Sequence, residues 1–224
     1  MTVERCGIWV IDPSQYNPED QGVEEILRGW PGESRLFRPA LDGNGPRPGD
    51  GYDTGAVVLM GSAASVHDNL PWLGPLRAWL RPILDGNTPR PLLGICFGHQ
   101  LIADMAGARV DWLDRSRHKR AGVERTEMRG SRLLGGDAGL NVVVSHRETV
   151  VEAPRGYRVT ATRPRVPYDG LEHETLEIFS YQFHPEARDE FAARNGIEEA
   201  EIDASVRADS RRVLDGFRRR CETG

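Results

Sequence analysis

Cys96 is the residue of this chain best placed to act as a nucleophile. It follows an apolar run, residues 91–95, of the kind that forms a buried parallel strand, and it precedes an amphipathic helix. Gly94 and Gly98 flank it in a Gly-x-Cys-x-Gly pattern, the thiol counterpart of the Gly-x-Ser-x-Gly nucleophile elbow. The N–H groups at the start of such a helix favour a thiolate and stabilise an oxyanion.

A cysteine beside an apolar strand is more often a small core residue, and that is the alternative for Cys96. Residues further along the chain favour the chemical role. His184 follows strand-like residues, and Pro185 ends that strand because proline donates no ladder hydrogen bond. Glu186 is placed to bind the second ring nitrogen of the histidine. His-Pro-Glu alone would indicate a surface turn, but together with the elbow it predicts a nucleophile, a base and an orienting carboxylate.

The motifs around these residues resemble those of a known family. Residues 94–100 (Gly-Ile-Cys-Phe-Gly-His-Gln) and 181–186 (Tyr-Gln-Phe-His-Pro-Glu) are similar to the two signature motifs of class I, triad-type glutamine amidotransferases. Residues 57–68 resemble the strand and loop that supply an oxyanion-hole N–H group in that family. Residues 144–150 resemble the Ser-His-x-Asp-x-Val stretch of its GMP-synthetase-like branch. On these matches the chain is identified as a free-standing member of that branch.

The resemblance implies a role for each matching residue. Cys96 would attack the γ-carboxamide of glutamine, and His184, oriented by Glu186, would protonate the departing ammonia and then activate water. The resemblance further implies roles in holding the substrate. The backbone N–H groups of Gly61, Ser62 and Phe97 would form the oxyanion hole, and the residues expected to contact the substrate are Gln100, Ser145 and His146. For His146, the alternative to a substrate contact is a structural role at a strand end.

Three features depart from the family pattern. Arg147 and Glu148 replace the usual small residue and Asp, and residues 61–65 read Gly-Ser-Ala-Ala-Ser. Residues 113–120 are rich in basic side chains where relatives often have a substrate-facing segment, which leaves strict glutamine specificity open. A basic cluster such as 115–120 is usually a solvated surface, and its role stays undetermined.

Composition limits the class of protein. The 224 residues are 38% hydrophobic and 28% charged, with a formal net charge of −5, which gives no footprint for nucleic acid. The three cysteines, Cys6, Cys96 and Cys221, are far apart, so we expect neither disulfides nor a metal site. Such cysteine usage favours a reducing compartment. No signal region or membrane-spanning run is evident, which favours a cytoplasmic protein without membrane partners. No cofactor is expected, because no ATP-binding loop is present.

The order of elements predicts an α/β fold. We expect a single domain over residues 1–224, with a core over about 5–187 and a helical segment over about 187–221. Its open, mostly parallel central sheet would be flanked by helices and carry a smaller antiparallel part, as in the flavodoxin-like class I glutaminase fold. Helices are expected at 20–30 and from Pro71 onward. The clearest predicted strands are 6–11, 36–37, 56–60, 91–95, 121–128, 140–145, 157–162 and 174–183.

Three functions are compatible with these residues. The first is a glutaminase that hydrolyses glutamine through a Cys96 γ-glutamyl thioester and passes ammonia to a separate synthase subunit, since nothing in the chain activates an acceptor. The second is a γ-glutamyl amide or peptide hydrolase that uses the same triad without a partner. The third is a non-catalytic binding or scaffold protein, which intact triad positions argue against.

Overall fold

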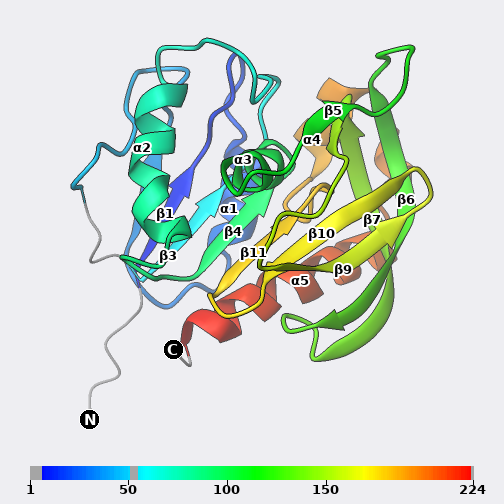
Figure 1. Ribbon diagram of the computed structural model, residues 1–224. Helices are drawn as coiled ribbons and strands as arrows, with labels where there is room; N and C mark the ends of the chain where they lie inside the picture. Colours follow the sequence, from blue (N-terminus) through cyan, green and yellow to red (C-terminus); the bar gives the residue numbers. More distant parts are fainter. Residues whose placement is uncertain (1–6, 51–54, 223–224) are drawn as a thin grey trace.

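A mixed sheet of nine strands forms the centre of the computed structural model, which describes residues 7–50 and 55–222 (Figure 1). The five strands at one side pair in parallel, and the other four are antiparallel, which confirms the predicted fold class. In spatial order the strands are β2 (Ser34–Phe37), β1 (Ile8–Ile11), β3 (Ala56–Leu59), β4 (Leu92–Ile95), β11 (Ile178–Tyr181), β10 (Val166–His173), β9 (Tyr157–Arg163), β6 (Arg120–Ser131) and β7 (Gly136–His146).

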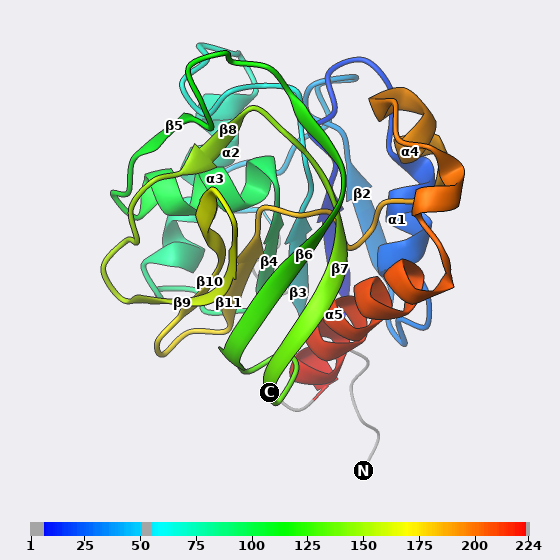
Figure 2. The same ribbon diagram turned by 90° about the vertical axis from the view of Figure 1, so that its right-hand side faces the viewer.

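The central parallel strands are buried along their whole length, because helices cover both faces of the sheet. Every residue of β1, β3, β4 and β11 is buried, and apart from Ser180 in β11 these strands show no polar residue alternating with apolar ones. Helices α2 (Leu73–Leu84) and α3 (Phe97–Met105) lie on one face, and α1 (Asp20–Leu27) and α5 (Ala204–Glu222) lie on the other (Figure 2).

Helix α2 shows how the covering layer is anchored. Its buried residues recur at helical spacing, and Trp79 stacks on Trp9 of β1 with ring centroids 5.7 Å apart. The helix predicted over 20–30 is α1, and it ends earlier, at Leu27. Gly29 has a φ of 74°, a left-handed conformation that turns the chain out of the helix before Pro31.

The antiparallel part is larger than predicted. The strands expected at 121–128 and 140–145 extend to form the long hairpin of β6 and β7, whose turn contains Gly135 and Gly136 at positive φ. The single strand expected at 174–183 begins at Ile178 instead, and β10 precedes it. A separate pair of short strands, β5 (Val110–Trp112) and β8 (Glu148–Val150), forms a second sheet.

The segment after residue 187 is helical, as predicted, but it is divided into α4 (Asp189–Asn195), a 3-10 turn (Glu199–Glu201) and α5. Ion pairs from Arg188 and Arg211 to the buried Glu25 hold this segment against α1. Cys6, the start of the first predicted strand, lies outside the described residues. None of the helices in the described ranges is both long and apolar enough to cross a membrane.

Candidate active site

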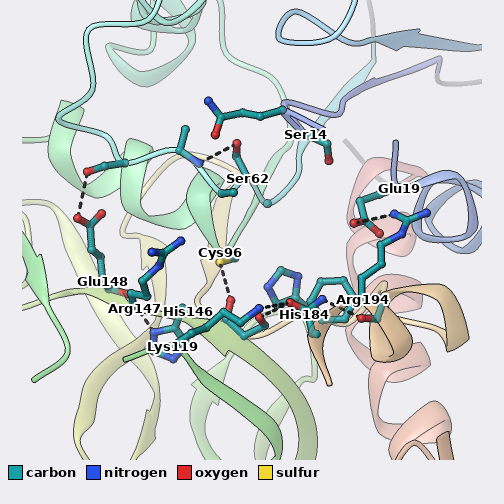
Figure 3. Close-up of a pocket in the computed structure, with 18 of the residues that line it drawn as sticks. Ser14, Glu19, Ser62, Cys96, Lys119, His146, Arg147, Glu148, His184 and Arg194 are labelled. Atoms are coloured by element: carbon teal, nitrogen blue, oxygen red, sulfur yellow. Dashed lines mark hydrogen bonds and ion pairs between the residues drawn. The ribbon is translucent and has the colours of Figure 1, made fainter. Parts of the chain in front are cut away.

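Cys96 occupies the turn between β4 and α3, at the carboxyl edge of the parallel strands (Figure 3). Its backbone has a φ of 50° and a ψ of −99°, a strained conformation for a residue with a side chain. The flanking glycines are sterically required. A Cβ atom on Gly98 would lie 2.2 Å from the Leu59 carbonyl oxygen, and one on Gly94 would lie 2.8 Å from the Gly98 backbone. The predicted nucleophile elbow is therefore present in the backbone.

His184 and Glu186 lie next to this turn. Nδ1 of His184 is 2.8 Å from Oε1 of Glu186, and both side chains are buried. Nε2 of His184 makes no hydrogen bond within the described chain. Burial lowers the pKa of His184, but the Glu186 carboxylate and the Cys96 sulfur raise it more, so that its pKa lies well above the usual value. The arrangement leaves one ring nitrogen for proton transfer and stabilises the imidazolium.

The Cys96 sulfur has a neighbour that the sequence analysis did not single out. Gln182 donates a hydrogen bond from Nε2 to Sγ over 3.5 Å, and its Oε1 accepts one from Nε2 of Gln100 at 3.1 Å. Gln182 is fully buried. It lies in a bend that follows β11, so no strand periodicity in the sequence marked it. An amide donor at this position stabilises negative charge on sulfur.

The expected oxyanion-hole residues are near Cys96. Phe97 is the first residue of α3, so its N–H has no partner in the helix. The turn at Gly61 and Ser62 lies beside the catalytic groups, because a Cβ on Gly61 would be 2.9 Å from Cε1 of His184 and 3.6 Å from Cβ of Cys96. Ser62 donates its hydroxyl to the Pro13 carbonyl at 2.7 Å, which fixes this loop.

A pocket of about 410 Å³ opens in front of Cys96 and is lined by all the expected substrate-contacting residues. Nε2 of Gln100 also donates to the Glu148 carbonyl at 2.8 Å, and the hydroxyl of Ser145 donates to Oδ1 of Asn195 at 2.7 Å. Both ring nitrogens of His146 have protein partners: Nδ1 is 2.9 Å from the Glu148 carbonyl, and Nε2 accepts from Arg163 at 3.0 Å.

These contacts limit what His146 offers to a ligand. Burial and the neighbouring Arg163 lower the pKa of His146 to about 4, so the ring is neutral and locked between strands. Arg163 is in turn paired with the buried Asp169 at 2.9 Å. This geometry supports the structural role for His146, whose ring is held by its two partners while the residue lines the pocket.

The opposite wall carries Glu19, which was not singled out from the sequence. Burial raises the pKa of its carboxyl to about 7, with Arg194 opposing the shift and Glu186 adding to it. Oε1 of Glu19 is 3.2 Å from Nη1 of Arg194. In the described residues no group of three or more His, Cys, Asp or Glu side chains is arranged to hold a metal ion.

Comparison with known proteins identifies the family. The model of the class I glutamine amidotransferases matches residues 67–199, which is more than half of the chain. The chain belongs to this family. GMP synthase (glutamine-hydrolyzing) of Burkholderia cenocepacia is 32% identical over 153 residues, which are 64% of this chain and 26% of the relative. That of Ralstonia pickettii is 31% identical over 141 residues, 58% of this chain and 24% of the relative. The chain thus spans about a quarter of the length of these relatives.

Solved structures share the fold. A glutamine amidotransferase from Thermotoga maritima superimposes with a TM-score of 0.78 at 19% identity, over 98% of this chain and 99% of that one. A candidate GMP synthase protein from Thermoplasma acidophilum gives a TM-score of 0.71 at 20% identity, over 97% of this chain and 94% of that one. The recognition of a GMP-synthase-related class I amidotransferase fold from the sequence motifs is confirmed.

Proposed function

We propose that this protein hydrolyses the γ-amide of glutamine through a covalent thioester on Cys96 and delivers the ammonia to a separate synthase subunit. The observation that carries the proposal is that Cys96, strained at a helix N-terminus, lies beside the buried His184. Nδ1 of His184 contacts Glu186, and Nε2 has no hydrogen-bond partner among the described residues. Family membership and the GMP synthase relatives support glutamine as the amide donor.

The chemistry is a two-step acyl transfer. The Cys96 thiolate attacks the γ-carbonyl carbon, and His184 holds the proton that left the thiol. Backbone N–H groups of Phe97 and the Gly61–Ser62 turn receive the tetrahedral oxyanion. His184 then passes its proton to the departing nitrogen, which leaves as ammonia, and the γ-glutamyl thioester remains.

The second step regenerates the enzyme. His184 removes a proton from water as the water attacks the thioester carbonyl, and the same proton returns to the sulfur as glutamate leaves. Glu186 keeps Nδ1 of His184 protonated, so Nε2 is the atom that exchanges protons in both steps. Gln182 stabilises the sulfur anion each time it forms.

A second candidate function, hydrolysis of γ-glutamyl amides or peptides without a partner, is favoured by the size and rim of the pocket. Its volume of about 410 Å³ falls within the range of about 300–1,000 Å³ that is typical of sites for larger ligands. Trp112 lines it with 37% of its surface exposed, and Tyr16 with 78%. These aromatic side chains would pack against a leaving group larger than ammonia.

Glutamate release decides between the two functions. The isolated protein is incubated with glutamine and with a panel of γ-glutamyl amides and dipeptides. Turnover of glutamine that rises when a synthase is added supports the amidotransferase, and strong turnover of the conjugates alone supports the hydrolase. Cys96→Ala should abolish either activity. Cys221→Ala, which alters a buried cysteine outside the pocket, is the matched control. Full activity in Cys96→Ala would refute both.

A further inference from the structure

Two cations that line the pocket lack an anionic side-chain partner among the described residues. Lys119 and Arg147 are exposed residues that line the pocket together with Cys96, and neither makes an ion pair within residues 7–50 and 55–222 (Figure 3). By contrast, Arg194 on the opposite wall is paired with Glu19 and Glu190. Unpaired cations that face a pocket, when other pocket cations are neutralised, indicate a ligand that brings the negative charge.

One hydrogen bond directs the exposed Lys119 side chain toward the site. Its Nζ donates to Oδ1 of Asn195 at 2.8 Å, and the same oxygen accepts the hydroxyl of Ser145. The Ser145 carbonyl lies 3.8 Å from the sulfur of Cys96, so this short chain of contacts connects the ammonium group to the nucleophile. Burial and the like charge of Arg147 both lower the pKa of Lys119. An anion bound between the two cations would relieve their repulsion.

A carboxylate without a cationic partner in the described part of the chain accompanies them. Glu148 follows Arg147 in the chain and lines the same pocket, yet the two side chains form no ion pair with each other. Oε1 of Glu148 instead accepts the hydroxyl of Ser65 at 3.1 Å. A pocket wall with separated positive and negative groups matches the α-carboxylate and α-ammonium groups of an amino acid.

We propose that Lys119 and Arg147 form the subsite that binds the α-carboxylate of the γ-glutamyl substrate. The inference rests on the proposed function and names residues for its specificity. It gives the basic segment 113–120 a role, since Lys119 comes from it. Glu148 is then placed to face the α-ammonium group. A carboxylate on the leaving group, as in γ-glutamylglycine, is the other source of the same charge.

The test compares steady-state kinetics of Lys119→Gln and Arg147→Gln with those of Arg115→Gln. Arg115 is exposed in the same segment, lies outside the pocket, and its substitution removes the same charge. The substrates are L-glutamine, L-glutamine α-amide, which lacks the α-carboxylate, and γ-glutamylglycine. Each pocket substitution should raise the KM for L-glutamine by about tenfold to a hundredfold, with little change in kcat. The KM for the α-amide should not change, and Arg115→Gln should behave as wild type.

Binding of L-glutamine to Cys96→Ala, measured by calorimetry with and without the same substitutions, separates this inference from the proposed function. If the wild type turns over glutamine but neither pocket substitution raises KM or weakens binding, the subsite is refuted and the function stands. If binding depends on Lys119 and Arg147 but the wild type releases no glutamate, the function falls and the subsite stands. If the substitutions raise KM only for γ-glutamylglycine, the two cations bind the carboxylate of the leaving group, and the α-carboxylate assignment is refuted. Absence of both binding and turnover would refute both.

Discussion

Gly61 and His184 are in such close contact that a single added methyl group would strike the imidazole. A Cβ atom on Gly61 would lie 2.9 Å from Cε1 of His184 and 3.6 Å from Cβ of Cys96. The oxyanion-hole turn therefore rests directly against the proposed base and nucleophile. Glycine at this position keeps the imidazole within reach of the sulfur.

Substitution of Gly61 by Ala should therefore reduce kcat for glutamate release by at least about tenfold, because the imidazole must move out of line with the sulfur. The free energy of unfolding should fall as well, because the imidazole that must move is buried, hydrogen-bonded to Glu186 and packed against Phe191. Gly74→Ala is the control, because a Cβ there meets nothing within 4 Å. Wild-type kcat in Gly61→Ala would show that His184 tolerates displacement or is not the base.

Gln182 gives a second test, through the reactivity of the sulfur. Gln182→Leu keeps the buried volume and removes the amide that donates to Sγ, so we expect kcat/KM to fall about tenfold. The rate at which iodoacetamide alkylates Cys96, followed by mass spectrometry, should fall with it. Cys221 in the same sample is an internal reference. Unchanged alkylation and turnover would assign Gln182 a purely structural role.

The backbone elbow at Cys96 could be predicted because its signal is local. Gly94, Cys96 and Gly98 lie within five residues, and the strand before them is a continuous apolar run. The left-handed backbone of Cys96 and the tight contact of Gly98 with Leu59 follow from that short pattern.

Long-range contacts explain what the sequence analysis missed. Strand β10 contains Pro167, Asp169 and Gly170, residues that disfavour strands, and its buried Asp169 accepts hydrogen bonds from Arg163 of the adjacent β9 and from Thr126 of β6. The contact of Gln182 with Cys96 joins residues 86 positions apart. The sequence around either residue gives no sign of the other, so this contact can be recognised only in the folded structure.

The pair of His184 and Glu186 predicts a pH-dependent effect on stability. The pKa of His184 is raised in the folded protein. The stabilisation from the His184 imidazolium is therefore complete below the pKa that His184 has in the unfolded chain, and it is lost as the pH rises through the raised pKa of the folded protein. Glu186→Gln removes the carboxylate that raises this pKa. The loss of unfolding free energy relative to wild type, measured with urea, should be larger at about pH 6 than at about pH 9.5. Equal losses at both values would mean that the imidazolium is not stabilised by Glu186.

Glu19 predicts a dependence of stability on pH in a lower range. The pKa of its carboxyl is raised from 4.5 to about 7 by burial, so the unfolded chain releases this proton at lower pH than the folded one. The stabilisation that this carboxyl provides is therefore complete below its pKa in the unfolded chain. It is lost as the pH rises toward and through about 7, the pKa in the folded protein. A glutamine at position 19 stays neutral and has no such dependence.

The stability of Glu19→Gln relative to wild type should accordingly increase between about pH 5 and about pH 8, as measured by urea unfolding at both values. Loss of the ion pair with Arg194 adds an offset, so the change with pH is the relevant quantity. Glu24→Gln, at an exposed position of helix α1, which Glu19 precedes, is the matched control and should differ little from wild type at either pH. A relative stability of Glu19→Gln that stays constant or falls over this range would show that Glu19 is ionised throughout. The wall opposite Lys119 and Arg147 would then carry a full negative charge at neutral pH.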